Sequence, residues 1–415
     1  MAGDGEVFEL SAAALTVVSG ADQAGVRAYN ERLMLSLVRR YRQLSKVEVA
    51  RVTGLSVQST SAIMNRLQAD GLLQREAPMR GRVGQPTIPF SLDPEGAFSF
   101  GLKIGRRSCD LVLIDFDGQV RQRVHETYPY PTPEKVKDFV SRTLPAMEQT
   151  LSRRQTLRVA GLGIASPFQL WNWDVETGAP PGALEVWRSV DIAAEISKLS
   201  SYPVTLFNDA TSACAAEFFF GDAWRHRDFL YFFVGSFVGG GLVLDGALYP
   251  GRTGNAAALG SMPVRPLGAS DERMVQLISA ASIYQLERRL SAAKIDPSSI
   301  WRTPDSWADF GDLLDQWIEE ASYALAYATI AAVAVIDVKA VIIDGAMPTN
   351  VRDRVVARTA HHFGAMDQRG LSDLAIARGS IGPDARAIGG AALPLIKNFA
   401  RDREVLFKDA PTVPV

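Results

Sequence analysis

The stretch that decides the fold runs from Ser45 to Asp70 and reads SKVEVARVTGLSVQSTSAIMNRLQAD. Ser45 and Glu48 have the spacing of a capping box, which predicts that a short helix, Lys46 to Thr53, begins here. Gly54 follows where a sharp turn needs a left-handed backbone, and Ser56 can cap a second helix that runs to about Asp70. A helix, a glycine-containing turn and a second helix form the hairpin with which many proteins read DNA.

The second helix of this hairpin is expected to have one buried and one exposed face. Ile63, Met64 and Leu67 repeat at helical spacing and should pack inward. Short side chains near the start of the opposite face would let the helix sit deep in the major groove, where amide and guanidinium groups read base edges and hydroxyls reach phosphates. The predicted DNA-contacting residues of this face are Val57, Gln58, Ser59, Ser61, Ala62, Asn65 and Arg66.

The flanking sequence completes a winged helix-turn-helix over residues 21–92, after an N-terminal arm of residues 1–20. Apolar residues over about 26–42 predict a preceding helix. Strand-like segments at Leu72–Glu76 and Thr87–Leu92 are joined by a glycine-rich loop with Arg80 and Arg82, a composition that suits the phosphate backbone or the narrow minor groove. A helical hairpin that mediates only protein contacts is the alternative, but cap, turn, polar face and basic loop together favour DNA.

The charge distribution agrees with this interpretation. Residues 21–90 carry 11 Lys and Arg against 5 Asp and Glu, a balance of +6, so the net charge of −2 leaves −8 for the rest of the chain. A small basic module on an acidic body is typical of nucleic-acid-binding proteins. A solvated basic helix face would give the same count.

Composition predicts a cytoplasmic protein of two or three domains. The chain has 415 residues, of which 47% are hydrophobic and 22% charged, as in soluble globular proteins. No apolar run reaches the roughly 18 residues of a membrane span, and no basic segment precedes the first apolar stretch as in a secretory signal. We expect no membrane partner. Cys109 and Cys214 lie among apolar or small residues, which predicts free buried thiols.

Beyond residue 95, strands and helices alternate. This pattern predicts two α/β lobes around a cleft, the first formed by 93–215 with about 384–405 and the second by 216–383. Strands are expected at Phe98–Ile104, Cys109–Asp115, Val120–Tyr128, Arg158–Ala165, Val204–Asn208, Phe229–Gly235, Gly240–Leu244 and Ala340–Asp344, and helices at about 133–153, 308–335, 349–362 and 384–400.

Several short segments, in their order along residues 26–400, resemble the ROK family of repressors, uncharacterised reading frames and sugar kinases. They are Gly54-Leu55-Ser56, Gly71-Leu72, Gly84-Gln85-Pro86, Asn208-Asp209-Ala210, Gly239-Gly240-Gly241 and Gly254-Asn255-Ala256. The resemblance implies an actin-like ATPase fold, whose two lobes enclose a sugar and nucleotide cleft. It also implies that the N-terminal module is the winged helix-turn-helix of the family's sugar-responsive repressors.

The resemblance places Asp209 at the position of the family's catalytic base, but the phosphate site departs from the pattern. The family's first phosphate loop, D-x-G-G-T, is replaced by Lys103-Ile104-Gly105-Arg106-Arg107. A lysine cannot hold magnesium, and two arginines crowd the phosphates, so we expect no Mg-ATP binding and no catalytic residue. The glycines of the second loop, Val234–Gly241, are retained, as a tight hairpin would also require.

The sugar site of the family is altered as well. Ala258 and Ser261 stand where the resemblance requires Glu and His, and a further family Glu falls on Gln276. The cysteines of the family's zinc loop are missing between Ser261 and Ile283, so no zinc is expected. Tryptophans in the cleft segment, Trp171, Trp173 and Trp187, could stack on a sugar or pack in the core. Candidate effector-binding residues are Ser166, Asn208, Asp209, Gly254, Asn255, Ser261 and Gln276.

The sequence therefore favours a transcriptional regulator, expected to repress carbohydrate transport or catabolism genes. Its partners would be a double-stranded DNA operator and a small carbohydrate or derivative, and two half-sites would be read by a homodimer or homotetramer. One alternative is a ligand-independent regulator controlled by a protein partner, which the loss of sugar-binding carboxylates allows. An ATP-dependent sugar kinase is a less favoured alternative.

Overall fold

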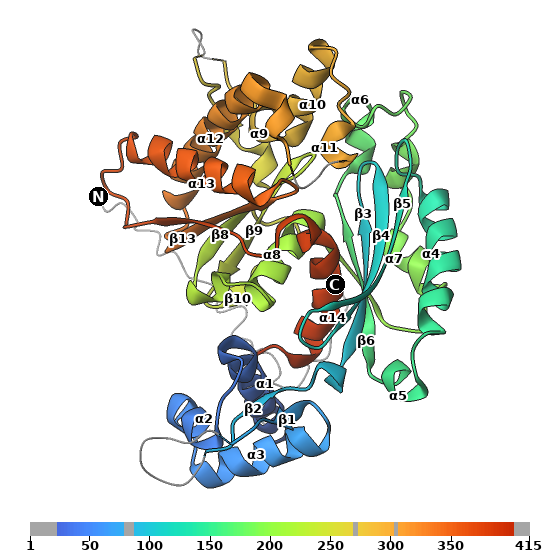
Figure 1. Ribbon diagram of the computed structural model, residues 1–415, viewed down its shortest axis with the longest axis vertical. Helices are drawn as coiled ribbons and strands as arrows, with labels where there is room; N and C mark the ends of the chain where they lie inside the picture. Colours follow the sequence, from blue (N-terminus) through green and yellow to red (C-terminus); the bar gives the residue numbers. More distant parts are fainter. Residues whose placement is uncertain (1–22, 79–86, 269–272, 303–305, 402–415) are drawn as a thin grey trace, which may run out of the picture.

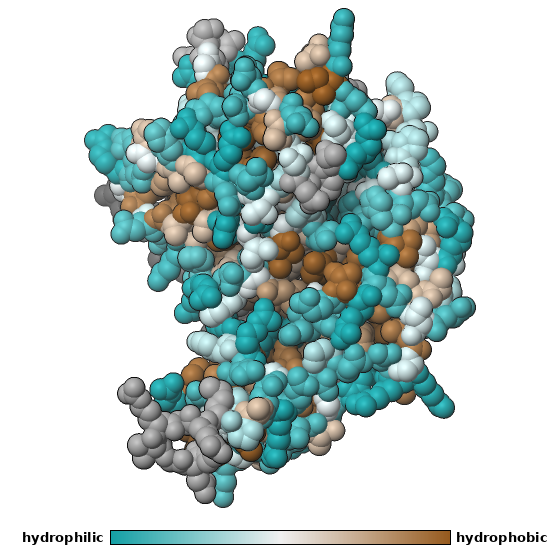
Figure 2. Space-filling model, in the orientation of Figure 1, coloured by the Kyte–Doolittle hydropathy of each residue, from teal (hydrophilic) through white to brown (hydrophobic). Residues whose placement is uncertain are grey.

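The structure is a computed structural model that describes residues 23–78, 87–268, 273–302 and 306–401. A small head, formed by the first helices, lies at one end, and two α/β lobes stand side by side above it (Figure 1). Hydrophilic residues cover much of the face in Figure 2, and hydrophobic residues show at its centre, between the lobes. None of the helices in the described ranges combines the length and the hydropathy that a membrane crossing requires.

The head is the predicted helical hairpin, preceded by one long helix. Its helices are α1 (Gln23–Tyr41), α2 (Lys46–Thr53) and α3 (Val57–Ala69). The backbone N–H of Ser45 donates to Glu48 Oε2 at 2.8 Å, and the N–H of Glu48 donates to Ser45 Oγ at 3.3 Å, so both halves of the capping box are formed. Gly54 ends α2 with φ +72°, a left-handed conformation that a side chain would disfavour.

Two short strands follow the hairpin, as in a winged helix. Strand β1 (Leu73–Arg75) pairs antiparallel with β2 (Phe90–Leu92). The predicted contacts Arg80 and Arg82, between the two strands, lie outside the described residues, as does the N-terminal arm.

The first lobe contains a five-stranded mixed sheet in the order β5-β4-β3-β6-β7. Helices α4 and α7 cover one face, and α14 packs on the other. The bounds are β3 (Phe98–Ile104), β4 (Ser108–Asp115), β5 (Val120–Thr127), β6 (Val159–Ser166), β7 (Val204–Asn208), α4 (Pro133–Glu148), α5 (Arg153–Thr156), α6 (Asp174–Thr177), α7 (Ile192–Ser197), α8 (Asp209–Phe219) and α14 (Ala385–Phe399).

The second lobe repeats this plan with the order β10-β9-β8-β13-β14. Helices α12 and α13 lie on its outer face, and α8 packs on its inner face. The bounds are β8 (Phe229–Val234), β9 (Val238–Leu244), β10 (Ala247–Leu248), β11 (Pro263–Val264), β12 (Val275–Gln276), β13 (Ala340–Gly345), β14 (Ala375–Arg378), α9 (Ile278–Ala281), α10 (Ile283–Ala292), α11 (Ser299–Arg302), α12 (Gly311–Val333) and α13 (Thr349–Gly364). The predicted two-lobed α/β body is confirmed.

Helix α14 lies between the lobes and touches its neighbours backbone to backbone. A Cβ atom added to Gly389 would lie 1.8 Å from the carbonyl oxygen of Ser212 in α8. One added to Gly163 in β6 would lie 1.9 Å from the carbonyl oxygen of Gly390. These distances are far below van der Waals contact, so only glycine allows the observed packing.

The head shares a core with the body. Met34 and Val38 of α1 belong to one buried cluster with Phe116, which follows β4, and with Ala391 and Leu395 of α14. The head is therefore packed on the first lobe and on α14 rather than tethered beside them.

We predict that Gly389→Ala lowers the free energy of unfolding by about 2–3 kcal/mol, because the added methyl group must push α14 away from α8. The control is Gly364→Ala in α13, where a Cβ meets nothing within 4 Å and stability should be unchanged or raised by less than about 1 kcal/mol. Urea unfolding followed by circular dichroism measures both. Equal stability of the two variants would contradict the close packing.

Candidate functional site

The exposed face of α3 gathers the predicted DNA-contacting residues. Thr60, Met64 and Leu67 are buried. The predicted contacts lie on the other side, where Ser61 is half-buried and the others are exposed, namely Val57, Gln58, Ser59, Ala62, Asn65 and Arg66. This face is polar and carries short side chains over its first turn, which suits insertion into the major groove.

Two of these side chains have partners within the head. Asn65 Oδ1 accepts a hydrogen bond from Lys46 Nζ at 2.6 Å. Arg66 Nε lies 3.7 Å from a carboxylate oxygen of Glu31 and 4.0 Å from one of Asp70. Exposed pairs of this kind contribute little stability, but they hold both side chains at the surface of α3.

Lys46 and Arg75 form a cationic pair that sequence reasoning did not assign to the site. Lys46 Nζ lies 5.3 Å and Arg75 Cζ 5.8 Å from the ring centre of Phe90. Burial first, and then the charge of Arg75, lower the pKa of Lys46. An anion between two such cations relieves their repulsion, so this position suits a DNA phosphate. Because Arg75 and Phe90 come from paired strands, only the folded head brings the group together.

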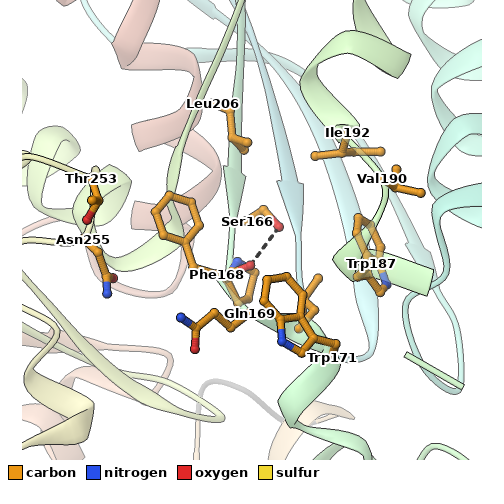
Figure 3. Close-up of a pocket in the computed structure, with 12 residues that line it drawn as sticks. Ser166, Phe168, Gln169, Trp171, Trp187, Val190, Ile192, Leu206, Thr253 and Asn255 are labelled. Atoms are coloured by element: carbon orange, nitrogen blue, oxygen red, sulfur yellow. Dashed lines mark hydrogen bonds between the residues drawn. The ribbon is translucent and has the colours of Figure 1, made fainter. Parts of the chain in front are cut away.

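A cleft between the lobes contains two adjoining cavities. The first, of about 300 Å³, is lined mainly by the segment that follows β6 (Figure 3). The second, of about 150 Å³, shares Pro167, Phe168, Gln169 and Asn255 with the first and extends to Asn208 and Asp209.

The structure brings most of the candidate effector residues to this cleft. Ser166 and Asn255 line the first cavity, and Asn208, Asp209, Asn255 and Ser261 line the second. A Cβ on Gly254 would lie 3.6 Å from the ring of Phe168, which places Gly254 at the edge of the cleft. Gln276 is exposed in β12 and lines neither cavity. Trp171 and Trp187 line the first cavity, whereas Trp173 lines the second.

Asn208 and Asp209 are both engaged within the protein. Asn208 caps α8, since its Oδ1 accepts from the backbone N–H of Ala210 at 3.0 Å. Asp209 Oδ2 lies 3.2 Å from Arg386 Nη1, and the two side chains are only 16% and 14% exposed. The guanidinium of Arg386 also stacks on Phe233, 5.0 Å from the ring centre. The Asp209 carboxylate is therefore already engaged by a cation of the protein itself.

The loop at the family's phosphate position is closed by a second buried ion pair. Arg106 Nη2 lies 3.0 Å from Glu287 Oε2, which joins the first lobe to α10 of the second, and both side chains are 8% exposed. Trp301 Nε1 donates to the other oxygen of Glu287 at 3.0 Å. The Arg106–Glu287 pair and Trp301 thus fill this loop with large side chains and a cation. The phosphate loop of the family has small residues and a carboxylate at this position.

Lys103, at the position of the family's metal-facing carboxylate, forms an ion pair with Asp110. Its Nζ lies 3.0 Å from Asp110 Oδ2. Burial alone would raise the pKa of Asp110. The charge of Lys103 and hydrogen bonds from His125 and Arg123 instead hold this pKa well below its usual range. Lys103 is thus held in a buried ion pair, as Arg106 is.

The described residues also lack a metal-binding cluster, since no three or more His, Cys, Asp or Glu side chains are grouped to hold an ion. Cys109 and Cys214 are free and buried, as predicted. Burial raises the pKa of the Cys109 thiol to about 12, so this thiol is not nucleophilic near neutral pH.

We predict that Arg386→Ala destabilises the protein by about 1–3 kcal/mol, because it leaves the Asp209 carboxylate unpaired in a largely buried place. The double variant Arg386→Ala/Asp209→Asn should recover part of this loss, which a double-mutant cycle by urea unfolding measures. Arg369→Ala, which removes an exposed ion pair with Asp367, is the control and should leave stability unchanged. If the effects of Arg386→Ala and Asp209→Asn on the free energy of unfolding simply add in the double variant, the pairing is contradicted.

Comparison with known proteins agrees with this geometry. The ROK family model matches residues 99–396. An uncharacterised protein of Sinorhizobium fredii is 24% identical over 89% of this chain and 91% of its own. The xylose repressor of Bacillus subtilis is 22% identical over 59% of this chain and 62% of its own. The Escherichia coli DNA-binding transcriptional dual regulator NagC is 23% identical over 59% of each. The chain thus spans about three fifths of the named regulators it matches.

Solved structures show the same fold. A ROK family transcriptional regulator, a homologue of the E. coli MLC protein, superposes with a TM-score of 0.63 and 17% identity over 92% of this chain and 99% of its own. A ROK family glucokinase from Streptomyces griseus, in complex with glucose and AMPPNP, gives a TM-score of 0.55 and 19% identity over 72% of this chain and 99% of its own. Because the family model covers most of the chain and the fold agrees, the protein belongs to the ROK family.

Proposed function

We propose that this protein is a DNA-binding transcriptional repressor of carbohydrate transport or catabolism genes, acting in the cytoplasm. The observation that carries the proposal is the exposed polar face of α3, presented on a capped helical hairpin beside the Lys46–Arg75 pair. The relatives named as xylose repressor and NagC support the same function.

The operator would be double-stranded DNA with two half-sites. One head presents one recognition helix, so reading a two-fold symmetric operator requires a homodimer or a homotetramer. Heads on one face of the duplex must lie about 34 Å apart or a multiple of it. A change in head spacing would therefore release the DNA.

The kinase-like body would serve as a sensor rather than as an enzyme. Asp209 is paired with Arg386, and Arg106 with Glu287, where phosphoryl transfer would need a free base and a phosphate cradle. We propose that the body uses neither Mg-ATP nor zinc, and that the cleft binds a small carbohydrate or derivative.

Helix α14 offers a route from this cleft to the head. Arg386 lies in its first turn and contacts Asp209 in the cleft. Near its other end, Leu395 shares a core with α1, and the backbone N–H of Arg401 donates to Ser36 Oγ at 3.3 Å. A ligand that competes with Arg386 for Asp209 would shift α14 and, with it, the head. The two arrangements would then differ in their affinity for DNA.

One prediction of this function concerns the head. Asn65→Ala or Arg66→Ala should relax or abolish specificity at one base position, because these residues would read base edges. Lys46→Ala or Arg75→Ala should weaken binding to all sequences and reduce the slope of log Kd against log salt by about 1 each, because one phosphate contact is lost. The operator is first identified by genome-wide footprinting, and affinities are then measured by fluorescence anisotropy over a salt series.

The control is Arg354→Ala, which removes an exposed arginine in α13 of the second lobe, far from the head. It should change neither the base specificity nor the salt dependence of DNA binding. The assignment of α3 would be contradicted if the Asn65 and Arg66 variants lost as much affinity as the Lys46 and Arg75 variants, with no change in base specificity or in salt slope. Arg80 and Arg82 stay predicted backbone contacts, and their alanine variants should behave like Lys46→Ala.

Another prediction of this function concerns the body. A coupled ADP-release assay with Mg-ATP and a panel of hexoses and pentoses should show no turnover above background, because Asp209 is paired with Arg386 and Lys103 stands where the family has a metal-facing carboxylate. Turnover that is abolished by Asp209→Asn would refute the sensor role of the body and establish a sugar kinase.

A further inference from the structure

The first cavity of the cleft is hydrophobic along most of its wall, and this composition identifies a class of ligand. We infer that the effector is an uncharged glycoside with a flat aromatic group, and that this cavity accommodates the aromatic group. The inference rests on the proposed function, because it names the ligand of the same sensor.

Most of the residues that line the cavity are apolar, and polar side chains provide the rest. Trp171 and Trp187 lie near each other in the cavity wall, and Ile192 and Leu206 line the cavity above them in this view (Figure 3). Trp187 is 6% exposed, and its Nε1 donates to the backbone oxygen of Pro131 at 3.0 Å, so its polar edge is already satisfied. Among the described residues that line this cavity, none carries a charge. An ionised group would be desolvated there without a partner, so the ligand should be neutral at this end.

The polar end of the cleft provides few groups for sugar hydroxyls. Asn208 Oδ1 is used to cap α8, and Asp209 is paired with Arg386. Ala258, at the position of the family's Glu, contributes only a methyl group. A free hexose carries a hydroxyl on nearly every carbon, and each buried hydroxyl without a partner opposes binding. A free sugar therefore fits this cleft poorly.

Polar side chains gather instead at the junction of the two cavities. Gln169 and Asn255 lie there, next to the ring of Phe168, and Ser166 lines the first cavity beside them (Figure 3). A glycoside could place its sugar hydroxyls against these groups, with one hydroxyl reaching Asp209 in place of Arg386, and extend its aromatic aglycone toward Trp187. The aromatic group would supply the affinity that the sugar lacks, since apolar surface removed from water and ring stacking both favour binding.

The test compares matched ligands by isothermal titration calorimetry on the full-length protein. The probes are phenyl and methyl β-glycosides of D-glucose, D-galactose and D-xylose. For at least one sugar, the phenyl glycoside should bind at least about tenfold more tightly than the methyl glycoside. Equal affinity within every pair, or no binding of any phenyl glycoside, would overturn the inference.

Substitutions locate the preference in this cavity. Val190 lines it, so Val190→Phe fills the space and should abolish the preference for the phenyl glycoside. Val186→Phe makes the same change at a side chain that is 38% exposed outside both cavities and should retain the preference. Trp171→Ala removes a wall instead of filling the space and should reduce the preference at least about fivefold. Persistence of the full preference in both cavity variants would overturn the inference.

Operator binding separates this inference from the proposed function. If the protein binds its operator and methyl glycosides release it as well as phenyl glycosides do, the repressor function stands and the aromatic ligand is wrong. If the protein binds no operator in footprinting, the proposed function fails whatever the cleft binds.

Discussion

The backbone contact between α14 and its two neighbours, β6 and α8, is the constraint on which the rest of the structure depends. Gly163 and Gly389 allow this contact, because a methyl group at either position would overlap a carbonyl oxygen. Interfaces made of side chains can adjust by changing rotamers, whereas backbone atoms in contact have no such freedom. Helix α14 is thus fixed between the lobes. Its position in turn determines where the cleft residues Asp209 of α8 and Arg386 of α14 meet.

The head is held on this assembly by a buried arginine. Arg39 of α1 donates to the backbone oxygen of Phe116 at 2.6 Å, and its guanidinium lies 4.2 Å from the ring centre of Phe219 in α8. Burial lowers the pKa of Arg39 to about 9, which reflects the cost of desolvating the charge. The carbonyl and the aromatic rings offset this cost. Because only Asp93–Ala97 separates β2 from β3, the body orients the head directly.

Local signals in the sequence were sufficient to predict the head. The capping box joins residues three positions apart, and Gly54 acts on its own backbone, so neither depends on the rest of the chain. Most strands of the two large sheets were predictable for the same reason, since hydrophobic periodicity is local, but β10 and β14, at the edges of the second sheet, were not predicted. Gln276 shows the limit of transfer by resemblance. Gln276 was matched to a family Glu that lies beyond a loop that is shorter in this chain. The structure shows that Gln276 is exposed in β12, outside both cavities.

The contacts that define the cleft could not be predicted in this way. Arg386 meets Asp209 across 177 residues, and Arg106 meets Glu287 across 181. No periodicity or spacing encodes such pairs, because they exist only when the lobes and α14 are assembled. The sequence showed that carboxylates of the kinase pattern are missing. It did not show that arginines form ion pairs with Asp209 and Glu287.

In the proposed regulator, these ion pairs would let a kinase-like cleft control DNA binding without catalysis. In a kinase the catalytic carboxylate must stay free to accept a proton, whereas here Asp209 holds the first turn of α14 through Arg386. Arg386 Nε has no hydrogen-bond partner among the described residues, so one bond to Asp209 and the stack on Phe233 carry much of its stabilisation. A ligand that takes this bond removes the anchor of one end of α14, while the other end stays packed on α1. The binding energy that a kinase would use for catalysis would then be available to move the head.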